Sequence, residues 1–251
     1  MKRIIASLVA IGLLCSGCAS KPNRTLTIAA AANMQFAMKE LTREFTTQSG
    51  IPCTITVSSS GKLTSQIQAG APYDVFVSAN LKYPNSLHNQ GLTMGEPKVY
   101  ALGRLVMWTM KTDINPTLES LVDESISYVA IANPKFSPYG QAGIESLKAS
   151  KVYSQIKEKL VFGESIAQVN QFILSSSADV GFTSKSVVLS TKVDKEGQWQ
   201  EINHTLHAPI QQGLVILKNQ DNQRESAYQF QEFLFSKTGQ NILKKYGYEP
   251  I

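Results

Sequence analysis

The stretch Leu26-Thr27-Ile28-Ala29-Ala30-Ala31-Ala32-Asn33 decides the fold of this chain, because it has the pattern of a buried strand that leads directly into a helix. The run over 26–31 is short and apolar and follows a polar stretch, as expected for a strand of a parallel sheet. Beyond it, apolar residues recur at helical spacing from Met34 to Phe45. Asn33 stands where an asparagine side chain favours a helix N-cap. The sequence therefore predicts a strand, a turn and a helix over 26–45.

A second unit of the same kind follows the first. The β-branched run over 53–57 predicts a strand, Ser58-Ser59-Ser60-Gly61 forms the turn, and a helix begins near Lys62 and ends at Gly70. The carboxyl ends of parallel strands share one edge of a sheet, so both helix N-termini face one crevice. The first amides of a helix are unpaired and the helix dipole is positive there. The two turns therefore predict a site where neutral donors bind an anion.

Plain helix capping is the alternative explanation for either turn alone, because Ser and Asn cap helices in most proteins. Two such turns in consecutive units favour the anion site. A Walker A phosphate loop is excluded at Ser60-Gly61-Lys62. That motif needs an earlier glycine where this chain has Thr56, and Ser or Thr where it has Leu63.

Strands and helices alternate along the rest of the chain. Apolar runs predict strands over 74–78, 102–110, 128–132, 160–162, 180–183 and 215–217, and helical spacing predicts helices over 140–149, 166–174 and near the C-terminus. Alternation of this kind is typical of the α/β class with largely parallel sheets. The chain has 251 residues, enough for one large domain or two small lobes.

The N-terminus has the features of a secretion signal. Lys2 and Arg3 precede an apolar run over 4–14 that is too short to span a bilayer stably. The stretch Cys15-Ser16-Gly17-Cys18 resembles a bacterial lipobox, which predicts a signal peptide over 1–17 and lipidation of Cys18. Ordinary cleavage after Ser20 is the alternative. Either outcome places the mature protein outside the cytoplasm, in the periplasm or an equivalent extracytoplasmic space.

Charge and cysteine content exclude several classes of function. The formal net charge of the whole chain is +5, and removal of Lys2 and Arg3 reduces it further, so there is no footprint of nucleic-acid or membrane binding. Three cysteines do not make a disulfide framework. With Cys15 removed and Cys18 lipidated, only Cys53 remains. It sits in a predicted strand, where a buried and inert thiol is expected.

The residues together resemble the molybdate-binding protein family of bacterial ABC importers, which belongs to the type II periplasmic binding proteins. The resemblance extends from about Leu26 to the end of the chain. Its marks are the two turns already quoted, with Leu63, Gln66 and Ile67 after the second, and the stretches 69–79, Asn133-Pro134, Tyr139-Gly140, Val180-Gly181-Phe182 and 243–248. No single mark is specific, but the set is.

The resemblance implies a two-lobe type II periplasmic-binding-protein fold with the ligand in the interlobe cleft. Lobe one would comprise residues 25–105 plus 208–251, and lobe two residues 106–207. Two segments would cross between the lobes, near 103–107 and 209–214.

The resemblance also implies the ligand residues. In the first lobe they fall on Asn33 and Ser60, with Ala32 as a possible additional amide and Ser59 as the alternative to Ser60 under a one-residue shift. In the second lobe they fall on Tyr139 and Ile166, both acting mainly through the backbone N–H. Some members of the family use a Tyr hydroxyl at the position of Ser184, which is a shorter side chain here.

The implied function is capture of molybdate, with tungstate as a second ligand, and delivery to the membrane permease of an ABC importer. The chain would act as a monomer, without a cofactor, and molybdenum would enter only as the bound oxyanion. The proposed donors are neutral and suit a fully ionised tetrahedral dianion. Protonated phosphate would leave a buried O–H unpaired, at a cost of about 1–3 kcal/mol. Sulfate passes the same test, so only the resemblance selects molybdate.

Two other classes compete with this interpretation. An enzyme in the same crevice would need chemistry that the residues do not suggest. His204 and His207 fit a surface pair better than a metal site, Cys53 lacks a nucleophile motif, and Asp74 fits a turn or cap better than a base. A binding protein for an organic anion or siderophore would be expected to place aromatics or an arginine at the crevice, where only Tyr139 is expected.

Overall fold

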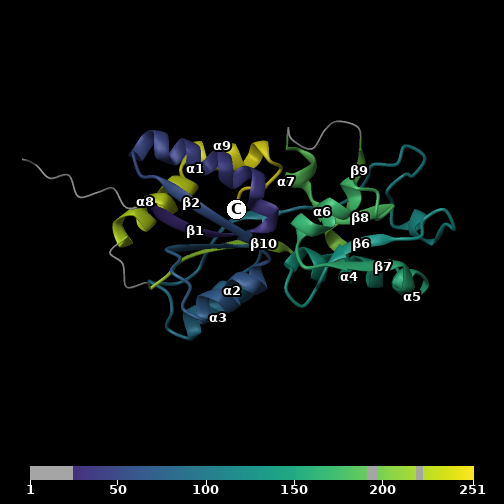
Figure 1. Cartoon of the computed structure of the whole chain (residues 1–251), viewed down its shortest axis with the longest axis horizontal. Coiled ribbons are helices and arrows are strands. Elements are labelled where there is room, and N and C mark those ends of the chain that lie inside the picture. The colour runs from purple at the N-terminus through teal and green to yellow at the C-terminus, as the bar shows by residue number, and fades with distance from the viewer. Residues whose placement is uncertain (1–24, 191–196, 219–222) are drawn as a thin grey trace, which may run out of the picture.

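The computed structural model describes residues 25–190, 197–218 and 223–251. The chain forms two α/β lobes that lie end to end along the long axis of the molecule (Figure 1). Each lobe is built on a five-stranded sheet, with the strand order β2-β1-β3-β10-β4 in the first and β7-β6-β8-β5-β9 in the second. The predicted signal peptide and the lipidation site at Cys18 lie outside the described residues.

The first sheet consists of β1 (Leu26–Ala31), β2 (Cys53–Ser58), β3 (Val75–Ser78), β4 (Lys98–Gly103) and β10 (Ile210–Ile216). The helices around it are α1 (Gln35–Ser49), α2 (Ser60–Gln68), α3 (Lys82–Asn89), α8 (Arg224–Phe235) and α9 (Lys237–Lys245), with the 3-10 turn η1 (Ala32–Met34) after β1. In Figure 1, α1, α8 and α9 lie on one side of the sheet, and α2 and α3 lie on the other.

The second sheet consists of β5 (Leu105–Thr109), β6 (Val129–Ala132), β7 (Leu160–Gly163), β8 (Val180–Ser184) and β9 (Gln198–Glu201). Its helices are α4 (Pro138–Ala149), α5 (Tyr153–Ile156), α6 (Ile166–Leu174) and α7 (Lys185–Val188), with 3-10 turns η2 (Glu119–Val122), η3 (Lys157–Lys159) and η4 (His204–Leu206). The apolar core of this lobe continues into Ala31, Ala32 and Ala79 of the first lobe, so the two lobes share packing at their junction.

Strand register places the two predicted turns side by side. β1 and β2 are parallel, and Ala31 at the end of one lies opposite Ser58 at the end of the other. The segments that follow, η1 and α2, therefore start at the same edge of the sheet. In the second lobe, Ala132 at the end of β6 lies opposite Gly163 at the end of β7, which aligns the starts of α4 and α6 in the same way.

Both sheets are mixed, whereas the sequence predicted largely parallel ones. β10 is antiparallel to β3 and β4, and β5 is antiparallel to β8 and β9. The antiparallel strands belong to the segments that cross between the lobes. The predicted strand over 102–110 is in fact the end of β4 and the whole of β5, divided at Arg104. A chain segment that passes from one sheet to another loses its strand pairing at the residue where it leaves the first sheet. An apolar run in the sequence does not show where that residue is.

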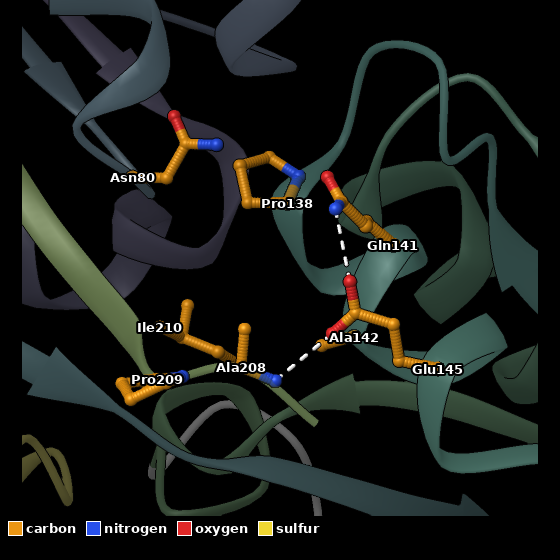
Figure 2. Close-up of a pocket in the computed structure, with 8 residues that line it drawn as sticks. All are labelled: Asn80, Pro138, Gln141, Ala142, Glu145, Ala208, Pro209 and Ile210. Carbon is orange, nitrogen blue, oxygen red and sulfur yellow. Dashed lines mark hydrogen bonds between the residues drawn. The ribbon is translucent and has the colours of Figure 1, made fainter. Parts of the chain in front are cut away.

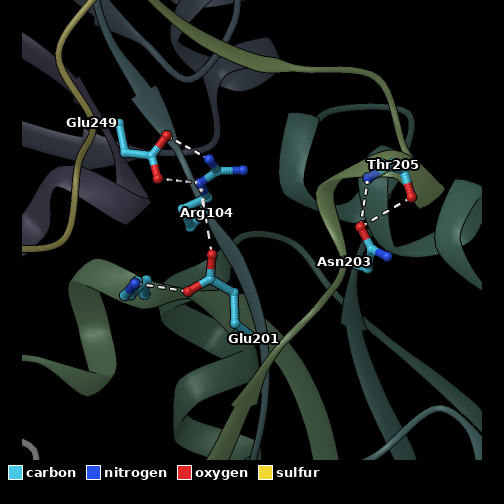
Figure 3. Close-up of polar contacts among 6 residues, drawn as sticks. Arg104, Glu201, Asn203, Thr205 and Glu249 are labelled. Atoms are coloured by element: carbon cyan, nitrogen blue, oxygen red, sulfur yellow. Dashed lines mark hydrogen bonds and ion pairs between the residues drawn. The ribbon is translucent and has the colours of Figure 1, made fainter.

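Arg104 joins the first crossing to both lobes (Figure 3). Its guanidinium forms a two-pronged hydrogen-bonded pair with the carboxylate of Glu249, in which Nε lies 2.8 Å from Oε1. The same Nε lies 3.6 Å from the carboxylate of Glu201 at the end of β9. Glu249 also exchanges two backbone hydrogen bonds with Leu102 of β4. The C-terminal segment is thus fastened to β4 and to the first crossing.

Among the residues described, no helix combines the length and apolar character that crossing a bilayer requires. Cys53 is half-buried rather than fully buried, and it is a free thiol. Burial raises the pKa of this thiol to about 11, which keeps it protonated and unreactive near neutral pH.

Candidate oxyanion site

Four helix starts meet at one small cavity between the lobes. Its lining consists of Ala31, Ala32, Asn33, Ser59, Ser60, Ala79, Ser137, Pro138, Tyr139 and Ile166. Every one of these residues is buried, so the cavity lies in the interior between the lobes. The cavity is small: the space open to the centre of a water-sized sphere is about 10 Å³. The structure therefore brings together Asn33, Ser60, Tyr139 and Ile166, which the sequence had singled out.

The start of α2 offers the backbone and side chain of Ser60. In this first turn, the N–H of Gly61 bonds to Phe136, that of Lys62 to the Ser59 hydroxyl, and that of Leu63 to the Ser59 carbonyl. The N–H of Ser60 is the first in the helix and has no intrahelical acceptor. The Ser60 hydroxyl accepts a 3.0 Å bond from the N–H of Ala79, which leaves its own proton to donate.

Asn33 is not the helix N-cap that the sequence predicted. It lies inside η1, and the residue before α1 is Met34, which makes no side-chain cap. The side-chain amide of Asn33 donates instead to Gln212 Oε1 and to the Tyr248 hydroxyl, each at 2.8 Å. Both amide protons are thus engaged within lobe one. Toward the cavity, Asn33 has its backbone N–H to offer.

The start of α4 singles out the N–H of Tyr139. Ser137 caps this helix, its hydroxyl accepting from Gly140 N–H at 3.4 Å and its carbonyl from Gln141 N–H at 3.0 Å. Pro138 has no N–H to satisfy. Among the described hydrogen bonds of this turn, the N–H of Tyr139 is the donor left over. Its hydroxyl is also buried and makes no hydrogen bond with the described residues.

The start of α6 offers the N–H of Ile166. Ser165 precedes it with extended backbone, φ −156° and ψ 169°, and makes no side-chain cap. Within this turn the carbonyl of Ser165 accepts from Val169 N–H at 3.1 Å. The N–H groups of Ile166, Ala167 and Gln168 belong to the first turn, where the helix itself supplies no acceptor. Ile166 is buried and lines the cavity. Its side chain is apolar, so the donor that it can offer there is its backbone N–H.

The remaining predicted residues divide into two groups. Ala32 and Ser59 line the cavity, whereas Ser184 does not; its hydroxyl lies 2.8 Å from that of Ser186. Sequence reasoning missed four lining residues, Ala31, Ala79, Ser137 and Pro138. The Ser-Pro pair before Tyr139 was a detectable signal, because Pro is favoured at the first helical position and Ser at the N-cap.

The cavity is electrically neutral in its side chains. Its lining contains no Lys, Arg, Asp, Glu or His. Burial raises the pKa of Tyr139, and also that of Tyr248 beneath the cavity, so both phenols stay protonated near neutral pH. A positive potential therefore comes from the backbone amides and helix dipoles alone. An arrangement of donors without charged partners can hold a small dianion and offers little to a cation.

Contacts across the mouth of the cleft hold the lobes together. Lys62 Nζ lies 2.5 Å from Glu164 Oε2, and the Tyr83 hydroxyl donates to the Lys135 carbonyl at 3.1 Å. These groups belong to α2, α3 and the second lobe, so the bonds can form only while the lobes are in contact. The structure thus represents a closed arrangement around the cavity.

A second cavity lies beside the first and shares Pro138 with it (Figure 2). Its volume is about 100 Å³. Glu145 on α4 lines it, but both carboxylate oxygens are engaged, one by the Gln141 amide at 2.9 Å and the other by the Ala208 N–H at 2.9 Å. The Glu145–Ala208 bond ties α4 to the second crossing. The cavity therefore has the features of a packing gap at the hinge.

The described residues do not assemble a metal site. They contain no group of three or more His, Cys, Asp or Glu that would hold a metal ion. His204 is exposed in η4 and His207 is half-buried beside it, with its Nδ1 2.8 Å from the Ala208 carbonyl. Asp74 is buried before β3, where its Oδ2 accepts from the backbone N–H and the hydroxyl of Thr27, each at 2.7 Å. The carboxylate thus joins the segment before β3 to β1, instead of stabilising the local turn or helix cap that the sequence favoured.

Comparison with known proteins agrees with this geometry. The chain is 32% identical over 251 residues to the molybdate-binding protein ModA of Azotobacter vinelandii, covering 99% of this chain and 97% of that protein. It is 34% identical over 223 residues to ModA of Rhodobacter capsulatus, covering 88% and 86%. The solved structure of the Azotobacter vinelandii periplasmic molybdate-binding protein superposes with a TM-score of 0.84 at 30% identity, covering 89% of this chain and 98% of that one.

A family model extends over nearly all of both lobes. The model of the bacterial extracellular solute-binding proteins matches residues 26–249, a range that includes every helix start at the cavity. The match, the two-lobe fold and the neutral interlobe cavity agree, and the chain belongs to the bacterial extracellular solute-binding proteins.

Proposed function

We propose that this protein captures molybdate outside the cytoplasm and delivers it to the membrane permease of an ABC importer. The observation that carries the proposal is the convergence of four helix starts, two from each lobe, on one cavity without a charged side chain. The similarity to molybdate-binding proteins over most of the chain supports molybdate as the anion. Tungstate is a second ligand of the same charge and shape. The protein acts as a binding component and not as an enzyme.

The ligand set of this proposal is the N–H and hydroxyl of Ser60 and the backbone N–H groups of Asn33, Tyr139 and Ile166. Ala32 and Ser59 are additional candidates at the same wall. Ser184 is the weakest candidate, because its hydroxyl is engaged with Ser186 away from the lining. No acidic side chain is present to accept a proton from the ligand. A protonated phosphate would thus face a cost of about 1–3 kcal/mol that a fully ionised dianion avoids.

Size favours an inorganic anion over an organic one. The cavity is small, and residues at the starts of helices from both lobes form its walls. A small organic anion would require the lobes to stay further apart and would forfeit the contacts across the cleft. Sulfate is the competing inorganic ligand, since it is also fully ionised.

Calorimetric titration with molybdate, tungstate, sulfate and phosphate tests the proposal. We expect molybdate and tungstate to bind much more tightly than phosphate. Phosphate binding as tightly as molybdate would contradict the donor-only argument, and tighter binding of sulfate would assign the site to sulfate. Small-angle scattering adds an independent test of closure: the radius of gyration should be smaller with molybdate than without it, because the ligand is held from both lobes.

The proposal extends to the organisation of the whole chain. Lobe one would comprise 25–105 plus 208–251 and lobe two 106–207, with a signal peptide over 1–17 and a lipid on Cys18 that anchors a monomer to the membrane. Mass spectrometry of the membrane-extracted protein tests the lipid. A mature chain that begins after Ser20 without an acyl group would replace the anchor with ordinary secretion.

A further inference from the structure

A buried network of polar side chains lies directly behind the cavity. Lobe one contributes Asn33, Gln212 and Tyr248, and lobe two contributes Ser184 and Ser186. Of these residues only Asn33 lines the cavity, and each of them is at most 3% exposed. A buried polar group that lacks a partner costs stability, so a network of this size needs a reason to be kept in the core.

The bonds of Gln212 fix the direction of donation around the Asn33 side chain. Gln212 Nε2 donates to two carbonyls, Ile210 at 3.1 Å and Ala79 at 3.4 Å. Its Oε1 must then be the acceptor that faces Asn33, and the Asn33 amide donates to it. The second amide proton of Asn33 goes to the Tyr248 hydroxyl, 2.8 Å away. Two residues distant in sequence thus hold the Asn33 side chain from within its own lobe.

The link from lobe two is the hydroxyl of Ser186. It donates to the backbone carbonyl of Asn33 at 2.6 Å. The Tyr248 hydroxyl of lobe one lies 3.0 Å from the same carbonyl and 3.2 Å from the Ser186 hydroxyl, and it can donate its one proton to either. Ser186 belongs to α7, which follows β8 of the second sheet and packs against η1 and α1 of the first lobe. Because the donor and the acceptor lie in different lobes, separation of the lobes at this point would break the bond.

We infer that Ser186 is a positioning residue for anion binding, which acts by fastening the Asn33 backbone to lobe two when the lobes close. The inference rests on the proposed function, because it treats the Asn33 N–H as a donor to the anion. Ser186 does not touch the ligand. Its hydrogen bond stabilises the closed, ligand-bound state relative to the open one and so slows release of the anion.

Comparison of Ser186→Ala with Ser190→Ala tests the inference. Ser190 is a matched control, because its hydroxyl is also buried near the end of α7 but has no hydrogen-bond partner among the described residues. Loss of one net hydrogen bond predicts that Ser186→Ala binds molybdate about three- to tenfold more weakly. The weakening should lie mainly in a faster dissociation rate, measured by stopped-flow displacement. Ser190→Ala should change the affinity by less than about twofold.

The melting temperature of the ligand-free protein separates positioning from a structural role. The inference expects both variants to melt alike without ligand, and the molybdate-induced rise in melting temperature to be smaller for Ser186→Ala. Equal affinity and equal dissociation rates in Ser186→Ala and the parent would overturn it. So would an affinity loss that Ser190→Ala shares.

Titration of the unsubstituted protein with the four oxyanions shows whether a failure lies in the proposed function or in the role of Ser186. If the parent binds sulfate rather than molybdate, the ligand assignment fails, and the same pair of variants is compared with sulfate. If the parent binds none of the four oxyanions, both the function and the role of Ser186 are wrong. If the parent binds and Ser186→Ala binds equally well, only the role of Ser186 is wrong.

Discussion

The backbone N–H of Gly61 donates a 2.9 Å hydrogen bond to the carbonyl oxygen of Phe136, and this bond joins the first turn of α2 in lobe one to the segment before α4 in lobe two. The approach is possible because residue 61 has no side chain. A Cβ atom there would lie 2.9 Å from Phe136 Cα and 3.1 Å from Phe136 O, both backbone atoms that cannot swing away. Closure of the cleft therefore depends on a glycine at the lip of the site.

Gly61→Ala should impair ligand binding without impairing the fold. The added methyl group obstructs the closed arrangement, so we expect molybdate affinity to fall at least about tenfold, the effect of about 1.4 kcal/mol. The ligand-free protein should keep its melting temperature, since alanine favours the helix over glycine. Ser65→Ala, at an exposed position of the same helix, is the control. An affinity equal to that of the parent would show that the lobes close with a different contact.

Ser60→Ala and Ser59→Ala distinguish two neighbouring serines. We expect Ser60→Ala to lose about 1.5–3 kcal/mol of binding free energy, the range for a hydrogen bond to a charged group. Ser59 is the N-cap, so Ser59→Ala should instead lower the free energy of unfolding by about 0.5–2 kcal/mol. Titration calorimetry and urea unfolding of both variants measure the two effects. The reverse assignment would mean that the ligand contact belongs to Ser59.

Ile166→Pro and Ile166→Ala isolate a backbone amide. Proline deletes the N–H but suits the first turn of a helix, and the extended backbone of Ser165 is the conformation that a following proline requires. We expect Ile166→Pro to bind molybdate markedly more weakly than Ile166→Ala. Both variants lose packing, so their ligand-free melting temperatures serve as the control. If Ile166→Pro folds and binds as well as Ile166→Ala, the amide is not a ligand.

Tyr139→Phe should leave binding intact. The hydroxyl has no hydrogen-bond partner among the described residues, and the donor assigned to Tyr139 is its N–H. Removing an unpaired buried hydroxyl should change the affinity by less than about twofold, and it should leave the stability equal or slightly higher, since no hydrogen bond is lost. A large loss of affinity in calorimetry would instead place the phenol on the anion.

The pair between Arg104 and Glu249 predicts a specific dependence of stability on pH. The hydrogen bond from Arg104 lowers the pKa of the Glu249 carboxyl below its ordinary value of 4.5. A folded-state pKa below the unfolded one contributes stability that is present above pH 4.5 and disappears as the pH falls through the folded value. Because the Glu249 side chain is 45% exposed, the contribution should be under about 1 kcal/mol.

Glu249→Gln tests this dependence. Its unfolding free energy should fall below that of the parent at neutral pH and converge with it in acid, as measured by urea unfolding across the pH range. Glu158→Gln is the control, because Glu158 has only a 3.7 Å contact with Lys157 and is 90% exposed. A difference that stays constant down to low pH would rule out the carboxylate as its source.

The sequence alone determined the local strand and helix units of this protein and predicted where its candidate site would lie. The strand over 26–31 and the helix over 166–174 begin and end where their patterns predicted. Helix starts follow from local capping chemistry, and parallel strands bring their carboxyl ends to one edge, so the turns at 29–33 and 58–61 were identifiable from neighbouring residues. The individual residues Ser60, Tyr139 and Ile166 came from the family resemblance. The resemblance to a known family supplied the pairing of the two lobes.

Only the tertiary structure decided what the side chains of the site do. Asn33 has the local pattern of an N-cap, yet its amide bonds to Gln212 and Tyr248, which are 179 and 215 residues away. The break of pairing at Arg104 likewise depends on which sheet each flanking strand joins. Such partners come together through packing over long separations in the chain. A local sequence pattern shows which structure a segment favours. Which buried acceptor a side chain such as Asn33 bonds to depends on the residues that the fold packs around it.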